Sequence, residues 1–167
     1  MIKAAFASEV AENPSGDSGP CEPGWIDTWD LDLGCLFFGN DYGTFQDANT
    51  FCYNNSAHLV EIFTENQMDF MLMQLEFLET VTGRGRAYWA GGTDWNREGQ
   101  WYWAHSLMPI ESFVWYSPPF DGPAQQPNGD TNDNYMTFYP GLGYYCDDVP
   151  NFWDQGYPIC QKNSTTQ

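Results

Sequence analysis

The segment Tyr88-Trp-Ala-Gly-Gly92 separates a part of the chain with helical periodicity from a part without it. Before this segment, apolar residues recur at helical spacing over residues 44–53 and 64–83. Thr44 is a suitable N-cap for the first helix, and Thr64-Glu-Asn-Gln67 has the capping-box pattern for the second. The segment itself is short, apolar and glycine-rich, and it is a candidate buried strand. On the second helix the predicted apolar side consists of Met68, Met71, Leu72, Leu75 and Leu78, which we interpret as core residues rather than as part of a cofactor site.

The remaining elements are predicted to be strands. Alternating and aromatic residues predict a hairpin over Trp25–Phe38 and a strand at His58–Ile62. After the central segment, strands are expected at Gln100–Trp103, Tyr135–Tyr139 and Tyr157–Gln161. A hairpin, then two helices, then strands interrupted by one long loop is an α+β order.

Length and composition predict a single domain. The chain has 167 residues, of which 42% are apolar, and 8 Trp, 12 Phe and 10 Tyr are ample for a core. Residues 1–20 are expected to be a flexible N-terminal segment, 21–162 a domain and 163–167 a short tail. No apolar run approaches the ~20 residues of a membrane helix, so no membrane partner is expected.

The formal net charge is −18, from 5 basic and 23 acidic residues. This balance argues against nucleic acid, because phosphate binding needs lysine and arginine. It favours cations, although the charge alone is better explained by the solubility of an extracellular protein. Whether the protein binds a cation must therefore be judged from the local groups of carboxylates.

Five cysteines without CxxC or zinc spacing favour the disulfides of a secreted protein. The number is odd, so one thiol is left over. Asn54 and Asn163 begin N-glycosylation sequons, which are consistent with a secreted glycoprotein.

A long irregular stretch, Ser117–Asp133, is the candidate functional loop. It contains Gln126-Pro127-Asn128 and is followed by Cys146-Asp-Asp148. Amide and carboxylate oxygens of this kind suit calcium. Amides that remain free can bond sugar hydroxyls, since they both donate and accept. Tyr116 and Phe120 could stack on a sugar, although loop aromatics more often pack against their own domain.

These landmarks together resemble a long-form C-type lectin domain over nearly the whole chain. Any one motif is weak, but their order and spacing are specific. The matching motifs are Cys21-Glu-Pro-Gly-Trp25, Cys52 followed by Ala57-His-Leu-Val60, Trp89-Ala-Gly-Gly92, Trp101-Tyr-Trp103, Trp115 and Cys160-Gln-Lys162. The resemblance implies the C-type lectin fold, with two helices, small antiparallel sheets and a long calcium-binding loop.

The resemblance also implies the disulfides Cys21–Cys35 and Cys52–Cys160. The family's second conserved pair falls on Asn134 and Asn151 here, so the loop lacks its usual covalent link. The leftover Cys146 stands where the family has a tryptophan. It is either a buried free thiol or the site of an intermolecular disulfide, which leaves a homo-oligomer open.

By position, the resemblance assigns a calcium ion, and the sugar that it binds, to five residues. They are Gln126, Asn128, Asn132, Asp147 and Asp148, and the Gln126–Pro127 peptide is expected to be cis when calcium is bound. Asn132 replaces a usual glutamate, so Asp130 or Asp133 could take its place as a ligand. The alternative interpretation of this stretch is simple turn chemistry.

The sequence thus predicts a secreted, calcium-dependent lectin that binds glycans. Gln126 weakly favours galactose-type sugars, and mannose-type sugars stay open. The main alternative is a lectin-fold module that binds ice, mineral or protein instead of sugar. A glycosidase using paired carboxylates is disfavoured, because Asp147 and Asp148 are adjacent and are better explained as ligands, so the protein is not expected to be an enzyme.

Overall fold

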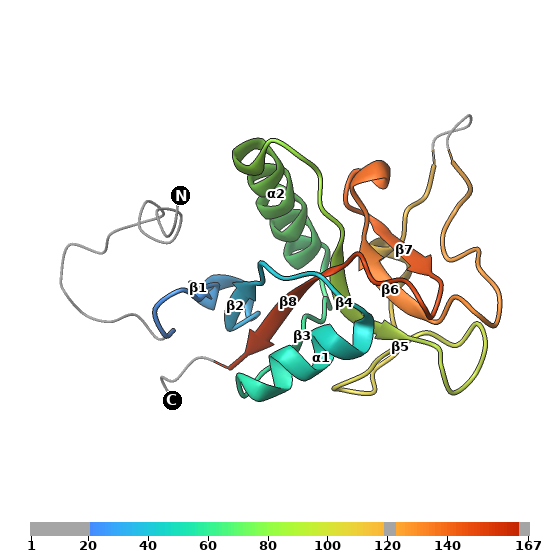
Figure 1. Cartoon of the computed structure of the whole chain (residues 1–167), viewed down its shortest axis with the longest axis horizontal. Helices are drawn as coiled ribbons and strands as arrows, with labels where there is room; N and C mark the ends of the chain where they lie inside the picture. Colours follow the sequence, from blue (N-terminus) through green and yellow to red (C-terminus); the bar gives the residue numbers. More distant parts are fainter. Residues whose placement is uncertain (1–20, 119–122, 164–167) are drawn as a thin grey trace.

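The computed structural model describes residues 21–118 and 123–163, and Figure 1 shows their arrangement. The elements, with η for 3₁₀ helices, are β1 (Ile26–Asp27), η1 (Trp29–Leu31), β2 (Cys35–Phe38), α1 (Phe45–Asn54), β3 (His58–Leu59), α2 (Glu65–Thr82), β4 (Tyr88–Thr93), β5 (Tyr102–Trp103), η2 (Ser112–Val114), β6 (Tyr135–Phe138), η3 (Pro140–Leu142), β7 (Cys146–Val149) and β8 (Tyr157–Lys162). The α+β class is confirmed. The expected flexible segment 1–20 and most of the expected tail lie outside the described residues.

The strands form one mixed sheet with β8 and β4 at its centre. Its order is β1-β2-β8-β4-β6-β7, with β3 paired to β8 and β5 paired to β4. The pair β4–β8 is parallel, with Tyr88 opposite Tyr157 and Trp89 opposite Pro158. The expectation of small antiparallel sheets therefore needs correction at this pair. The two strands are joined by long connections rather than by a hairpin turn, and only such connections allow parallel pairing.

Two strands differ from the prediction. The strand β7 was not expected, and it pairs antiparallel with β6, with Thr137 opposite Asp147 and Met136 opposite Asp148. The strand expected at His58–Ile62 is shorter, because only His58 and Leu59 pair with β8. The unexpected strand is the one that carries the predicted carboxylates.

Both helices begin at the predicted caps. The Thr44 hydroxyl accepts the Asp47 N–H at 3.2 Å, and the Asp47 carboxylate accepts the Thr44 N–H at 3.0 Å. Thr64 and Gln67 form the same reciprocal pair at the start of α2. The second helix ends at Gly83, whose φ of 71° is the left-handed conformation that glycine adopts readily. In Figure 1 the two helices lie on opposite sides of β8.

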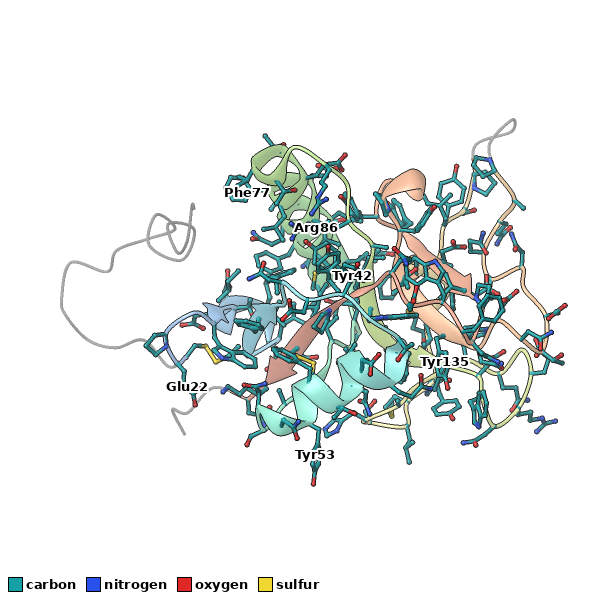
Figure 2. The ribbon with its side chains drawn as sticks, viewed as in Figure 1. Glu22, Tyr42, Tyr53, Phe77, Arg86 and Tyr135 are labelled. Carbon is teal, nitrogen blue, oxygen red and sulfur yellow. A yellow bond between two sulfur atoms is a disulfide. The ribbon has the colours of Figure 1, made fainter. Side chains whose placement is uncertain are left out.

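Each helix also presents large side chains to solvent. Tyr53 at the end of α1 is 78% exposed, and Phe77 on α2 is 51% exposed (Figure 2). Neither helix is both long enough and apolar enough to cross a membrane.

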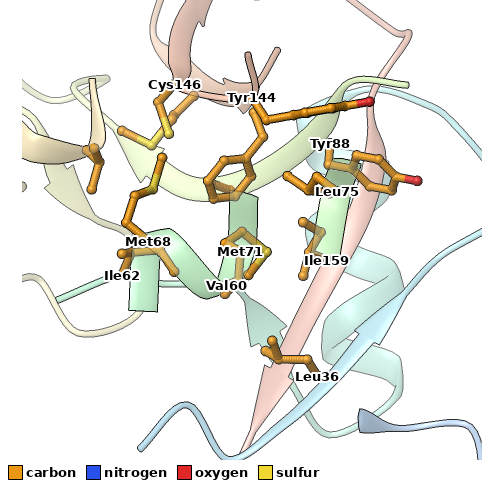
Figure 3. Close-up of a cluster of buried hydrophobic side chains, with 14 of the residues drawn as sticks. Leu36, Val60, Ile62, Met68, Met71, Leu75, Tyr88, Tyr144, Cys146 and Ile159 are labelled. Atoms are coloured by element: carbon orange, nitrogen blue, oxygen red, sulfur yellow. The ribbon is translucent and has the colours of Figure 1, made fainter. Parts of the chain in front are cut away.

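The main core lies between α2 and the sheet. Met68, Met71 and Leu75 of α2 are buried within it, as the apolar pattern predicts (Figure 3). Leu72 and Leu78 pack at its edge. The same cluster encloses Cys146, which is buried and unpaired. This matches the interpretation of Cys146 as a buried free thiol.

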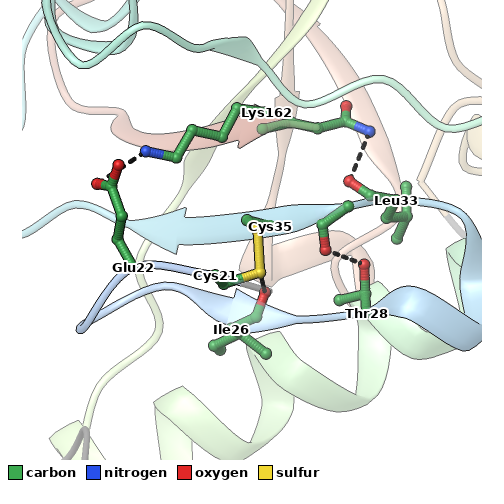
Figure 4. The surroundings of a disulfide bond; sticks show 9 residues. Cys21, Glu22, Ile26, Thr28, Leu33, Cys35 and Lys162 are labelled. Carbon is green, nitrogen blue, oxygen red and sulfur yellow. Dashed lines mark hydrogen bonds and ion pairs between the residues drawn. A yellow bond between two sulfur atoms is a disulfide. The ribbon is translucent and has the colours of Figure 1, made fainter. Parts of the chain in front are cut away.

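Both implied disulfides are present. Cys21–Cys35 links residues 14 apart beside the β1–β2 hairpin, where Lys162 Nζ lies 2.9 Å from a Glu22 carboxylate oxygen (Figure 4). The Cys52–Cys160 bridge links residues 108 apart and joins α1 to β8. The terminal strand is thus held covalently to the first helix.

Candidate functional site

Backbone hydrogen bonds anchor the long loop to β7. Tyr116 donates its N–H to the carbonyl of Cys146 at 3.2 Å, and Gln126 donates its N–H to the carbonyl of Tyr116 at 3.0 Å. Gln126 therefore lies close to the strand that carries Asp147 and Asp148, although the two segments are separate in the sequence. Residues 119–122, which include Phe120, lie outside the described residues.

Gln126 has a buried amide oxygen without a hydrogen-bond partner. The residue is 8% exposed, and its Oε1 accepts no hydrogen bond from the described residues. The Gln126–Pro127 peptide is cis. A buried carbonyl oxygen without a donor is unfavourable, and a hard cation is one partner that can satisfy it.

The carboxylate of Asp148 holds the start of the predicted calcium loop. Its Oδ1 accepts the Asn128 N–H at 2.9 Å, and its Oδ2 accepts the Gly129 N–H at 2.6 Å. A side chain at position 129 would collide with the Asp148 carboxylate and with Asp133. Glycine is therefore required sterically here, so that the loop backbone can approach the strand.

The following residues form a hydrogen-bonded turn. Asn132 donates both its backbone N–H and its side-chain amide to Asp130 Oδ1, each at 3.0 Å. Asp133 donates its N–H to the Asp130 carbonyl at 2.8 Å. This is the turn chemistry considered from the sequence, and it coexists with a carboxylate-rich loop. Which of these three residues would ligate calcium therefore stays a proposal.

Asp147 is the most perturbed carboxyl group of the site. It is half-buried, and burial, followed by the charges of Asp148 and Asp133, raises its pKa to about 6. Desolvation and like charges both disfavour the ionised form. A bound cation would reverse this preference, because it supplies the opposite charge.

Two further acidic residues border the site, and sequence reasoning missed both. Asp94 is 1% exposed, its Oδ2 accepts the Gly99 N–H at 2.8 Å, and its Oδ1 has no partner among the described residues. Desolvation, with a smaller contribution from Asp148, raises the pKa of Asp94. The pKa of Glu98 is raised by desolvation and then by Asp94. The sequence signal that could have identified Asp94 is its position as a carboxylate directly after the buried strand β4.

These observations test whether the residues fit calcium. Among the described residues, no three Asp, Glu, His or Cys side chains are grouped to hold a metal ion. The candidate set instead combines carboxylates with the amides of Gln126 and Asn128, and calcium accepts both kinds of oxygen. The unpartnered Gln126 Oε1 and the raised pKa of Asp147 are consistent with such a mixed site. The residues fit calcium if the amides take part.

Asn134 and Asn151, which replace the family's second cysteine pair, bond to each other. Asn151 Oδ1 accepts the Asn134 N–H at 3.1 Å and the Asn134 side-chain amide at 3.0 Å. The second amide bond of Asn134 goes to the Thr131 carbonyl at 2.9 Å. A buried polar contact therefore occupies the position of the covalent link and holds the loop end.

Comparison with known proteins places the chain in a family. The model of the C-type lectin domain matches residues 42–134, and the chain belongs to that family. The gorilla protein "C-type lectin domain family 4 member M" is 29% identical over 132 residues, which are 77% of this chain. Because this chain covers 30% of that relative's length, the likeness concerns one part of a longer protein.

Solved structures share the fold at low sequence identity. A calcium-independent type II antifreeze protein has a TM-score of 0.67 at 19% identity, covering 89% of this chain and 98% of its own. The carbohydrate-recognition domain of cow CD23, crystallised with a GlcNAc2Man3 oligosaccharide, has a TM-score of 0.65 at 22% identity, covering 88% and 98%. At these identities the likeness shows the C-type lectin fold alone.

Proposed function

We propose that this protein is a calcium-dependent glycan-binding protein. The observation that carries the proposal is the unpartnered Gln126 Oε1, buried next to the strand from which Asp148 holds the Asn128 backbone. Membership of the C-type lectin family supports it. The five proposed residues are Gln126, Asn128, Asn132, Asp147 and Asp148, within a lectin domain proposed to span residues 21–162.

These residues have different roles in the proposed site. Gln126 and Asp147 contribute oxygens that lack full solvation, and Asp148 both supplies charge and fixes the loop. The exposed side chain of Asn128 can reach a ligand. Asn132, whose Nδ2 donates to Asp130 Oδ1, offers its side-chain oxygen. When bound, calcium supplies coordination to two neighbouring sugar hydroxyls. Asp130 or Asp133 remains the substitute for Asn132.

The sugar class follows from donor and acceptor chemistry. A glutamine and an asparagine flank Pro127, and each amide can coordinate by oxygen and donate by nitrogen. The site therefore lacks the polarity that an amide and a carboxylate in fixed order would impose. Galactose-type sugars are weakly favoured through Gln126, and mannose-type sugars are the second class.

The wider setting is proposed on the same basis. Two disulfides fit an oxidising, extracellular location, and secretion with glycosylation at Asn54 or Asn163 is proposed. The protein is a binding module rather than an enzyme, with neither nucleic acid nor membrane as a partner. A homo-oligomer stays open.

A second candidate is binding of ice, mineral or protein without sugar. It is favoured by the structural likeness to a calcium-independent antifreeze protein. Large exposed side chains, including Phe152 at 82% exposure and Trp95 at 60%, also fit contact with a partner surface.

Thermal unfolding with calcium and with chelator tests the proposal. Binding to the native state alone adds about 2.7 kcal/mol at a hundredfold excess over the dissociation constant, so calcium should raise the melting temperature at neutral pH. An unchanged melting temperature would contradict the calcium site.

A glycan array then separates the two candidates. Wild type should bind glycans with calcium and lose them with chelator. Asp148→Asn should lose that binding and still fold, because the disulfides and the core do not depend on this charge, whereas Asp133→Asn should do much less. Normal glycan binding by Asp148→Asn would reject the lectin mechanism and favour the ice-, mineral- or protein-binding candidate.

A further inference from the structure

A hollow of about 690 Å³ opens beside the proposed glycan site. One of its walls is Pro127, which lies between the site residues Gln126 and Asn128. The rest of the wall comes from β5 and the chain on either side of it, up to Trp115. The hollow therefore lies next to two of the residues proposed to bind the sugar.

The lining of the hollow is uncharged and mainly apolar, with Gln100 and Ser112 as its polar side chains besides Tyr102. It includes Trp101, Tyr102, Leu107, Ile110 and Trp115, in addition to Pro127. Within the described part of the chain, no Asp, Glu, Lys, Arg or His lines it, although the protein has 23 acidic residues. A wall of this kind favours an uncharged, apolar group.

Two aromatic rings in the lining of the hollow hold each other in place. The Trp101 and Trp115 rings pack edge to face, with centroids 4.8 Å apart and planes at 75°. Trp115 is only 7% exposed, and Ile110 donates its N–H to the Trp101 carbonyl at 3.2 Å. A ligand would therefore meet preformed aromatic surface rather than mobile side chains.

Leu107 at the rim is both exposed and conformationally unusual. It is 71% exposed, and its φ of 61° lies in the left-handed region, which leucine rarely adopts. The turn is held by the Leu107 N–H, which donates to the Trp103 carbonyl at 2.8 Å. Unusual backbone conformations of this kind concentrate at binding sites. The fold thus keeps an apolar side chain at the edge of the hollow.

We propose that this hollow binds an apolar aglycone, such as an alkyl chain on the anomeric carbon of the bound sugar. The inference rests on the proposed glycan function and specifies its ligand class as amphiphilic glycosides. The sugar would occupy the Gln126–Asn128 site, and the chain would pass Pro127 to contact Leu107 and the two tryptophan rings.

Isothermal titration of the full chain with methyl and hexyl glycosides tests this. Matched pairs of β-galactosides and α-mannosides cover both sugar classes, with calcium and with chelator. Burial of each methylene is worth about fourfold in affinity, so partial burial of the hexyl chain should give at least about tenfold tighter binding.

Leu107→Asn is the discriminating variant. Asparagine tolerates the left-handed conformation, so the turn is kept while the apolar rim is lost. This variant should bind the methyl glycoside as wild type does and lose most of the hexyl advantage. The matched control is Met108→Asn, because Met108 is 53% exposed but does not line the hollow. It should keep the full advantage.

The outcomes separate this inference from the proposed function. If no methyl glycoside binds with calcium, the glycan function fails and the inference fails with it. If methyl glycosides bind but hexyl glycosides bind no tighter, the aglycone site alone is rejected. It is also rejected if the hexyl glycoside still binds more tightly than the methyl glycoside in Leu107→Asn or in the presence of chelator. A third outcome that rejects it is higher affinity only for a disaccharide, which supplies a second sugar in place of the alkyl chain.

Discussion

At the scale of single residues, Asp147 carries the clearest electrostatic conflict. Its folded-state pKa of about 6 lies above the ordinary value of 3.8, because of burial and then of Asp148 and Asp133. The folded protein therefore binds this proton more tightly than the unfolded chain does. The contribution of Asp147 to stability is full below the ordinary pKa and is lost as the pH rises through about 6.

We expect Asp147→Asn to stabilise the calcium-free protein at neutral pH. Asparagine resembles the protonated carboxyl and removes the repulsion, so the melting temperature with chelator should rise at pH ~7 and change little at pH ~3. Calcium should raise the melting temperature of the variant less than that of wild type, because one charged ligand is lost.

The control for this experiment is Asp69→Asn, an exposed carboxylate on α2. It should change the melting temperature only slightly. If Asp147→Asn raised the melting temperature no more at pH ~7 than at pH ~3, the repulsion assigned to Asp147 would be wrong.

The Asn134–Asn151 contact gives a second prediction at this scale. Asn134 is 5% exposed. In Asn151→Ala, the backbone N–H of Asn134 and one hydrogen of its side-chain amide would lose their acceptor. We expect a loss of about 1–3 kcal/mol of unfolding free energy, measured by urea unfolding. Asn96→Ala, which removes an exposed bond to the Tyr102 hydroxyl, should cost under about 0.5 kcal/mol. Equal losses would count against a structural role for the amide pair.

Sequence alone predicts which residue types occupy the site, but not how they are partnered. The resemblance indicates that Asn134 and Asn151 stand at the positions of the family's second cysteine pair. Their mutual hydrogen bond depends on how the loop end meets β7, which no local pattern encodes. The burial of Gln126 and the nearness of Asp94 likewise arise from contacts between segments far apart in the chain.

At the scale of elements, local signals predict the helix starts and fail for the paired strands. Capping needs only residues three positions apart, so Thr44–Asp47 and Thr64–Gln67 act within one turn. The strand β7 reads Cys-Asp-Asp-Val and lacks alternating polarity. It forms because β6 offers a partner. The parallel β4–β8 pair is equally non-local.

Gln67 does more than cap α2. Its Oε1 accepts the N–H groups of Phe63 at 2.7 Å and Thr64 at 3.2 Å, and its Nε2 donates to the Leu31 carbonyl at 2.8 Å. Gln67→Ala should therefore cost about 1–3 kcal/mol, since three partly buried backbone groups lose their partners. Thr64→Ala removes a cap alone and should cost about 1 kcal/mol.

Urea unfolding of the two variants compares these roles. The larger loss is expected for Gln67→Ala, because Gln67 is 4% exposed and links α2 to η1. A loss no greater than that of Thr64→Ala would mean that the link to Leu31 contributes little.

At the scale of the whole molecule, the last strand joins the two ends of the domain. The strand β8 lies between β2 and β4 and also pairs with β3. The first strands, the first helix and the centre of the sheet therefore all depend on residues 157–162 being in place. The Cys52–Cys160 bridge fixes this strand covalently to α1.

The two disulfides should contribute unequally, because they close loops of very different length. In the chain-entropy model, the 108-residue separation of Cys52–Cys160 corresponds to about 4.7 kcal/mol and the 14-residue separation of Cys21–Cys35 to about 3. We therefore expect Cys52→Ala/Cys160→Ala to lower the unfolding free energy more than Cys21→Ala/Cys35→Ala. Urea unfolding under oxidising conditions measures both. A larger loss for the hairpin pair would mean that local packing near β1, rather than loop closure, sets the value of each bridge.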